Sequence, residues 1–555
     1  MQDGGVHKIE IVFLFLLLFV AAFGALACKL KTPYPIVLVI AGLLLGFVPG
    51  IPRITLNPDI IFFVVLPPLL YSAAWRVPWR EFSYNLVSIF SLAFGLVTFT
   101  VLCVAEMAQR FLPGFDWRTG FALGAVVAPT DAIAATSIAR SMGLPKRIVD
   151  ILEGESLVND ASALLALEFG VAMLVRGQAP TVVSGLLRLA YLAAVGLVVG
   201  LLIGVIVNWI EHRIDIAPIE IALSLLTPYA AYLAADSIRA SGVLAVVACG
   251  LYLSRRSSGF FSPGVRLQAN AVWDSLTFIL NGLVFIFLGL QLPYVLEGAR
   301  DHNLSQLLMY GAFFSAFLIL LRLIWTFPGA RLSFFIRRRI LRQREPLPPA
   351  RQLFIIGWTG MRGVISLAAA IALPHTLANG APFAQRHLII FLAFSVILAT
   401  LVLQGLTLPP LIRALGLAGA TGRNIEEEEA RRVILETALR RLDEVRESAD
   451  EVRERADEVR ERADEVRESA RADFAEVFDD LELHYRDRLA ILTEEEADVR
   501  SASYRRFVEL SRELIQVERR TAIRLRNEGR INDDFLRQLE HELDLAESQF
   551  LTGGA

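Results

Sequence analysis

Apolar residues fill the first three quarters of the chain in long blocks, which short polar segments separate. A bilayer core of about 30 Å needs about 20 apolar residues per helix, and most blocks reach that length. The pattern predicts thirteen membrane-spanning helices, although the second and ninth blocks are short enough to leave twelve as an alternative. The expected spans are 9–28, 35–49, 58–75, 84–106, 118–140, 147–175, 181–210, 217–237, 241–254, 269–292, 304–330, 353–373 and 387–415.

Composition divides the chain into two parts that suit different solvents. Hydrophobic residues make up 55% of the 555 positions, against roughly 45–50% in a soluble domain. From Thr421 onward there are 24 Arg, 37 Asp or Glu and no Lys, so this part carries −13 and the first 420 residues carry +10. A soluble enzyme, a disulfide-rich secreted protein and a disordered chain are excluded. The sequence predicts an all-α polytopic membrane domain over 1–420 and a charged soluble tail.

The loops predict the orientation of this membrane domain. Loops after odd-numbered spans hold 18 Lys or Arg residues, and loops after even-numbered spans hold 7. Because basic residues accumulate in cytoplasmic loops, we expect the amino terminus outside and the tail in the cytoplasm.

The tail repeats nearly every seven residues over 441–470, with Ala and Val at the two apolar heptad positions. This predicts a heptad-repeat helix over 421–474, either in a coiled coil or as a single helix held by Glu/Arg pairs. A cytoplasmic helical domain is expected over 475–555, where apolar residues recur with helical period. The tail is too acidic for nucleic acid, and we expect it to bind a regulator or to mediate assembly.

Polar residues interrupt three predicted spans, and each needs an explanation because charges inside a bilayer are costly. In the fifth span, Pro129 breaks the helix next to Thr130 and Asp131. A proline removes a backbone donor and disturbs the preceding turn. The interruption is either a plain kink that Asp131 caps, or part of an ion site.

The sixth span carries the densest polar cluster. Ser156 and Asp160 lie four residues apart and therefore on one helical face, and so do Glu155 and Asn159. A hydroxyl and a carboxylate on one face offer oxygen ligands for a small cation, and the carboxylate can hold a proton instead. An interhelical hydrogen-bond seam is the alternative. The pattern leaves the role of Glu168 undecided.

The twelfth span contains glycines at 357, 360 and 363 around Arg362, which needs a carboxylate or carbonyl partner at that depth. Glu155 is the expected partner, in a structural ion pair. The two interrupted spans are seven apart, so corresponding helices run in opposite directions. This arrangement is typical of inverted repeats with broken helices that cross at a midplane site.

Several motifs together resemble the monovalent cation:proton antiporter-1 family, the NhaP-type sodium/proton antiporters of bacteria. They are residues 66–70 (LPPLL), 128–132 (APTDA), 153–165 (EGESLVNDASALL), 241–245 (SGVLA), 287–292 (FLGLQL), 322–325 (RLIW) and 357–370 (GWTGMRGVISLAAA). The resemblance covers the chain to about residue 415. It implies a thirteen-helix antiporter fold with a core from spans 4–6 and 11–13, a homodimer in the bacterial inner membrane, and no cofactor.

The resemblance also implies roles for individual residues. The ion-binding aspartate matches Asp160, with Ser156, Thr130 and the neighbouring Asn159 completing the site. Asp131 is expected to balance the dipoles of half-helices. Some archaeal members carry a glutamate ligand in span three, where this chain has Ser72, so we expect water or the Ser72 hydroxyl in its place.

One carboxylate can hold one proton or one monovalent cation, so competition at Asp160 predicts electroneutral exchange of Na⁺, or Li⁺, for H⁺. Exchange of K⁺ on the same scaffold is the alternative. A remote one is an intramembrane hydrolase that uses Ser156, but the residues after Ser156 lack the second glycine of a nucleophile elbow.

Overall fold

The computed structural model describes most of the first 419 residues and isolated helical pieces beyond 514. The described ranges are 3–30, 32–48, 58–77, 79–176, 181–214, 216–260, 263–300, 303–343, 347–377, 380–419, 515–516, 518–520, 523–524, 542–543 and 545–546. Two compact units cover Met1–Thr421 and Gly422–Ala555. The expected heptad helix over 421–474 lies outside the described residues, as does most of the expected domain over 475–555.

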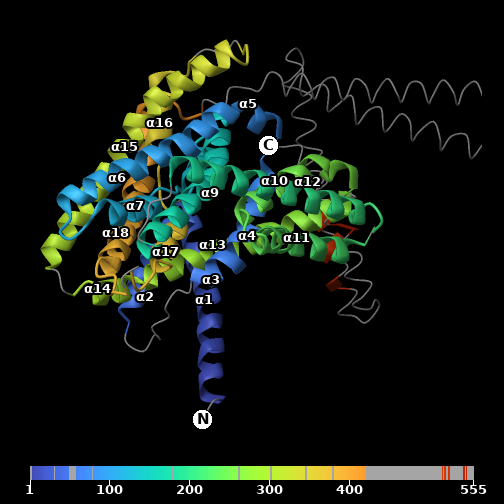
Figure 1. Ribbon diagram of the computed structural model, residues 1–555. Coiled ribbons are helices and arrows are strands. Elements are labelled where there is room, and N and C mark those ends of the chain that lie inside the picture. The colour runs from blue at the N-terminus through green and yellow to red at the C-terminus, as the bar shows by residue number, and fades with distance from the viewer. Residues whose placement is uncertain are drawn as a thin grey trace, which may run out of the picture. The chain divides into compact units, whose positions relative to one another are not determined.

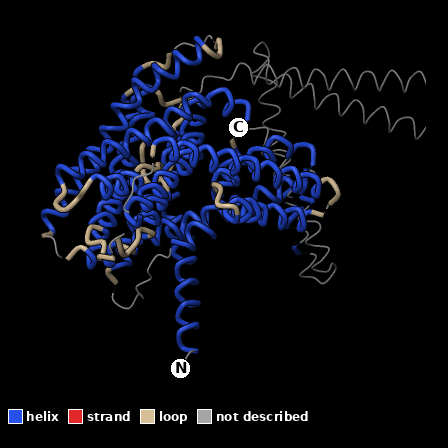
Figure 2. The backbone as a smooth tube through the Cα atoms, in the orientation of Figure 1, coloured by secondary structure: helices blue, strands red, loops and turns tan. Residues whose placement is uncertain are grey.

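Within the described residues the first unit is entirely helical apart from loops and turns (Figure 2). Each of the thirteen predicted spans corresponds to one helix or to consecutive helices, and the choice between thirteen and twelve membrane crossings stays a prediction. The first six are α1 (Asp3–Leu30), α2 (Tyr34–Gly46), α3 (Pro58–Ile60) with η1 (Ile61–Val65) and α4 (Leu66–Arg76), α5 (Trp79–Phe90) with η2 (Ser91–Leu96) and α6 (Val97–Phe111), α7 (Trp117–Val127) with α8 (Ile133–Ser141), and α9 (Lys146–Arg176).

The remaining seven spans follow the same pattern. They are α10 (Val182–Glu211), α11 (Ala217–Ser237), α12 (Gly242–Phe260), α13 (Pro263–Leu290) followed by α14 (Leu292–Gly298), α15 (Leu304–Arg339), α16 (Ala350–Trp358) with α17 (Val364–Ile371), and α18 (Arg386–Ala399) with η3 (Thr400–Gln404) and α19 (Gly405–Ala414). Among the described residues, eight continuous helical stretches are long and apolar enough to cross a membrane by length and composition.

Two spans are broken where the sequence predicts. The backbone leaves the helix over 128–132, between α7 and α8, and over 359–363, between α16 and α17. The two breaks are joined, because the backbone amide of Asp131 donates to the carbonyl of Met361 at 2.8 Å. Pro129 explains the first break, and the glycines at 360 and 363 permit the second. The fold thus contains two broken spans that meet at their interruptions.

Three π-helical turns, η1, η2 and η3, lie inside spans 3, 4 and 13. Hydrophobic periodicity does not predict them, because one extra residue in a turn leaves an apolar block equally apolar. Such turns are frequent at functional sites in helical proteins. Span 11 also differs from the prediction, since α15 continues nine residues beyond the expected end at 330 and carries Arg331, Arg337, Arg338 and Arg339 there.

The helices of the first unit pack in two groups (Figure 1). The crossing group contains α5–α9 and α15–α19 with η2 and η3, and the flanking group contains α1–α4 with η1 and α10–α13. The two groups meet where α4, α12 and α13 contact α9 or α17. In the flanking group, α2 and α13 approach closely at Gly42 and Gly289, where a side chain would strike the backbone of the other helix. This contact fixes the face that α13 presents to the crossing group.

Candidate ion-binding site

A cavity of about 480 Å³ lies where the two helix groups meet. Its crossing-group wall includes Thr130, Asp131, Ser156 and Asp160, and its flanking wall includes Ser72. The structure therefore brings five of the six predicted ion-site residues to one space. The sixth, Asn159, lies directly behind this wall.

Asp160 is 6% exposed, and its carboxylate lies at the cavity wall. Within the described part of the chain, no residue donates a hydrogen bond to it. Ser156 lies one turn earlier on α9, so both side chains reach the same space. Oxygen atoms of this kind suit small hard cations, and a buried carboxylate also has a strong affinity for a proton.

Ser156 also holds the first broken segment against α9. Its hydroxyl donates to the Thr130 carbonyl at 3.1 Å and accepts from the Ala132 amide at 3.3 Å. Because the hydroxyl proton goes to a backbone carbonyl rather than to a base, this geometry does not activate Ser156 as a nucleophile. The serine oxygen is therefore held in place as part of the cavity wall.

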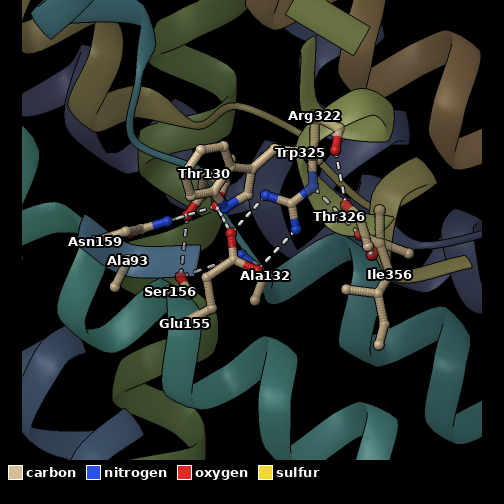
Figure 3. A network of polar contacts seen from close by, with 12 residues as sticks. Ala93, Thr130, Ala132, Glu155, Ser156, Asn159, Arg322, Trp325, Thr326 and Ile356 are labelled. Atoms are coloured by element: carbon tan, nitrogen blue, oxygen red, sulfur yellow. Dashed lines mark hydrogen bonds and ion pairs between the residues drawn. The ribbon is translucent and has the colours of Figure 1, made fainter. Parts of the chain in front are cut away.

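Asn159 and Glu155 fix Thr130 from the other side (Figure 3). The Asn159 amide nitrogen donates to the Thr130 hydroxyl oxygen at 2.5 Å and to its carbonyl at 3.3 Å. The Thr130 hydroxyl in turn donates to Glu155 at 3.1 Å. Asn159 is thus a positioning residue for the broken segment. It does not itself line the cavity.

The predicted ion pair between Glu155 and Arg362 is wrong, because the structure pairs Glu155 with Arg322. Nη1 and Nη2 of Arg322 contact Oε1 and Oε2 of Glu155 at 2.5 and 2.7 Å, as Figure 3 shows. The exposed fractions of the two side chains are 1% and 2%. Arg322 lies in the middle of α15. A basic residue at this depth of a predicted span is the feature of the sequence that could have indicated a buried ion pair.

Arg362 instead serves the ends of two half-helices. Its Nε donates to the carbonyl of Val127, the last residue of α7, at 3.2 Å. Its Nη1 donates to the carbonyl of Gly360, just after α16, at 2.5 Å. Helix carboxyl ends carry partial negative charge and unsatisfied carbonyls, so a fixed cation there stabilises both ends.

Asp131 has the opposite role at the two amino ends. Its Oδ1 accepts from the amide of Ile133, the first residue of α8, at 2.8 Å. Its side chain also lies against Gly363, which precedes α17, so that a side chain there would strike the carboxylate. The expected balancing of half-helix dipoles thus has a geometric basis, with Arg362 as its positive counterpart.

Charged residues also line the cavity. Arg76, Arg140 and Glu153 line it, and Arg140 pairs with Glu153 at 2.5 Å. Arg76 pairs with Asp274 of α13. Arg76 and Arg140 lie in the last turns of α4 and α8, at ends of spans that the sequence predicts to face the cytoplasm. Glu168, whose role the sequence leaves undecided, lies toward the other end of α9. It forms an ion pair with Arg188 of α10 at 3.0 Å.

Comparison with known proteins gives the same family over the same region. The family model described as "Sodium/hydrogen exchanger, transmembrane" matches residues 14–414. A protein of Mycobacterium tuberculosis, described as an uncharacterized Na⁺/H⁺ exchanger, is 32% identical over 558 residues, covering 99% of this chain and 97% of that protein. A sodium, potassium, lithium and rubidium/H⁺ antiporter of Bacillus pumilus is 34% identical, covering 74% of this chain and 62% of that protein.

The fold is similar to a solved structure of the sodium proton antiporter MjNhaP1 from Methanocaldococcus jannaschii. The TM-score is 0.57 at 19% identity, covering 74% of this chain and 99% of that one. Broken helices that cross beside a cavity with ionisable side chains define a secondary ion transporter. The chain belongs to the sodium/hydrogen exchanger family, whose members are antiporters and not enzymes.

Proposed function

We propose that this protein exchanges Na⁺, or Li⁺, for H⁺ electroneutrally, with cation and proton competing for Asp160. The observation that carries the proposal is a buried carboxylate at the cavity wall, beside Ser156 and Thr130, that no described residue binds. The nearby Asp131 is committed to the amino end of α8. One exchangeable carboxylate can therefore carry one positive charge in either direction.

The cation ligands that we propose are Asp160, Ser156 and Thr130, with Ser72 across the cavity. The Ser156 hydroxyl donates to a carbonyl and accepts from the Ala132 amide, so one of its two oxygen lone pairs remains for a cation. Ser72 lies on α4 and is buried at the cavity wall. Hydroxyl and carboxylate oxygens replace hydration water without adding a second ionisable group.

Alternating access would connect this cavity to the two sides of the membrane in turn. A second cavity of about 210 Å³ is lined by residues of α9 from Ala161 to Glu168, together with α10, α11 and α12. The linings of the two cavities thus adjoin at Asp160 and Ala161. Given the predicted orientation, we propose that the structure is open to the cytoplasm and that the second cavity belongs to the outward route.

The protein can also be tested for exchange of monovalent cations other than Na⁺ and Li⁺. The relative from Bacillus pumilus is described as an antiporter of sodium, potassium, lithium and rubidium. This favours a test of K⁺ and Rb⁺ exchange beside that of Na⁺ and Li⁺. Homodimer formation stays a prediction of the family resemblance.

The test is dissipation of a pH gradient in proteoliposomes by Na⁺, Li⁺, K⁺ and Rb⁺, with the membrane potential clamped or free. We expect exchange at the same rate in both electrical conditions. Asp160→Asn should abolish exchange and keep the elution profile of the folded protein, while the exposed Glu106→Gln serves as a control of equal charge change. Exchange that persists in Asp160→Asn, or that generates a steady current, would overturn the proposal.

A further inference from the structure

The two walls of the cavity differ in polarity. The crossing-group wall carries the proposed ligands, whereas the flanking wall is built largely from leucine, valine and phenylalanine of α4, η1 and α13. A cation bound only from one side would keep half of its water shell against an apolar surface. The few polar side chains on or beside the flanking wall are therefore candidates to complete its coordination.

Asn281 is such a side chain, and it lies well inside the 28-residue helix α13. It is 7% exposed and lines the cavity. Thr277 lies one turn earlier and lines the same cavity, while its hydroxyl donates to the Trp273 carbonyl at 2.7 Å. The two residues form a polar stripe on an otherwise apolar helix face. Buried amides need polar partners, so this placement calls for an explanation.

Tyr34 of α2 lies near Asn281 and lines the same cavity. The Tyr34 ring packs on Phe278 at 5.6 Å between ring centroids. Together with the close backbone contact of α2 and α13, this ring contact fixes the face that α13 presents to the cavity, and Asn281 lies on that face.

Ser366 provides an independent observation from the crossing group. It lies in the first turn of α17, is 1% exposed and lines the same cavity. Its hydroxyl has no hydrogen-bond partner among the described residues. A buried hydroxyl is normally bonded. A ligand bound in the cavity would give this buried hydroxyl the partner that the described residues do not provide.

We propose that the Asn281 carboxamide oxygen and the Ser366 hydroxyl oxygen are additional, neutral ligands of the transported monovalent cation. This inference rests on the proposed function and names further residues of the same site. Both oxygens would replace water around the cation, as carbonyl oxygens do in ion-selective filters. Because neither group ionises, the cavity gains coordination while Asp160 stays the exchangeable charge. These two neutral oxygens would thus replace part of the coordination that a glutamate in span three is expected to provide in some archaeal members of the family.

The location of Asn281 predicts that it affects cation binding from one face of the membrane and not from the other. It lines the first cavity, as Arg76 and Arg140 do, and it is not among the residues that line the second cavity. Asn281 should therefore contribute to cation binding from the face to which this cavity opens. A purely structural role would alter transport from both faces equally.

The experiment uses the full-length protein in vesicles with cation added to one face at a time. Asn281→Leu, which keeps the side-chain size, and Ser366→Ala should each raise the apparent KM for Na⁺ from the cavity face by about tenfold, as expected for a lost oxygen ligand. The maximal rate should change by less than about twofold. The KM from the other face should stay unchanged in Asn281→Leu. Ser275→Ala removes an exposed hydroxyl from α13 and is the matched control.

Each outcome decides between two hypotheses. If Asp160→Asn abolishes exchange but neither variant shifts the KM, or if Asn281→Leu lowers rate and affinity equally from both faces, this inference is overturned and the proposed function stands. If Asp160→Asn still exchanges, the proposed function itself fails. Should Asn281→Leu not fold, Asn281→Ser takes its place. This variant retains a side-chain oxygen, so its KM for Na⁺ should rise by less than the roughly tenfold expected for Asn281→Leu. Ser366→Ala tests the second proposed ligand independently.

Discussion

Glu155 and Arg322 form an ion pair whose two side chains are almost fully removed from solvent. The pair lies beneath Thr130, to which Glu155 is also bonded. Buried pairs add little net stability, but removing one partner leaves an uncompensated charge in an apolar environment. At the scale of single residues, the pair is therefore best tested by comparing single and double substitutions.

We expect Glu155→Gln to lower the stability of the protein by about 3–5 kcal/mol, because it leaves the Arg322 charge buried alone. The double variant Glu155→Gln with Arg322→Met should recover much of this loss. Thermal unfolding in detergent measures the difference, and Arg110→Gln, which breaks the exposed pair with Glu106, is the control. A double variant less stable than the single one would contradict the assignment.

Competition at Asp160 has a second signature at the residue scale. Where most Asp160 carboxylates hold a proton, each unit fall in pH should raise the apparent KM for Na⁺ about tenfold, since one proton must leave for each cation bound. The maximal rate at saturating Na⁺ should not fall with the same slope. Rates measured against Na⁺ at several pH values test this, and a KM independent of pH would rule out a shared site.

At the scale of elements, two half-helix pairs meet and their four ends are served by two side chains. Arg362 bonds the carboxyl ends of α7 and α16, and Asp131 serves the amino ends of α8 and α17. The backbone bond from Asp131 to Met361 joins the two breaks directly. The crossing is thus one structural element made from four short helices.

We expect Arg362→Ala to reduce folding yield, because the Val127 and Gly360 carbonyls lose their donor inside the protein. Because Arg362 and Arg322, the partner of Glu155, both lie against Gly360, the losses from Arg362→Ala and Glu155→Gln should sum to more than the loss of the double variant. Expression and melting temperature of the two single variants and the double variant provide the measurement. Strict additivity would indicate that the two sites act independently.

The sequence predicts the spans and the two breaks because apolar length, Pro129 and the glycines near Arg362 act locally. It also places Ser156 and Asp160 on one helical face, since that follows from their spacing. It does not predict that Arg322 reaches Glu155 before Arg362 does, because partner choice depends on how α15 packs beside α9. Nor does the sequence indicate the role proposed for Asn281, since its neighbours in the cavity wall are distant in sequence.

At the scale of the whole molecule, the tail accompanies the membrane domain in relatives. The similarity to the Mycobacterium tuberculosis protein covers 99% of this chain and therefore includes the region after Thr421. The described residues that line the cavity and form the crossing lie within Met1–Thr421. This division predicts that the tail modulates exchange without taking part in it.

We expect truncation after Thr421 to shift the dependence of exchange on pH or cation concentration and to preserve the maximal rate. The reason is that each proposed ligand lies in the first unit. Exchange assays on the truncated and full-length proteins in the same vesicles give the comparison. A truncated protein that folds but has lost turnover would show instead that the tail is required for the transport cycle.

The paired charges at the crossing have a practical consequence. Because Arg362 and Asp131 already neutralise the four helix ends, the crossing needs no bound metal to stay assembled, in contrast to a zinc finger that unfolds when its metal is chelated. Dialysis against sodium-free buffer should therefore leave an intact specimen. A difference density map between sodium-soaked and sodium-free preparations would then show the bound Na⁺, without changes caused by unfolding of the protein.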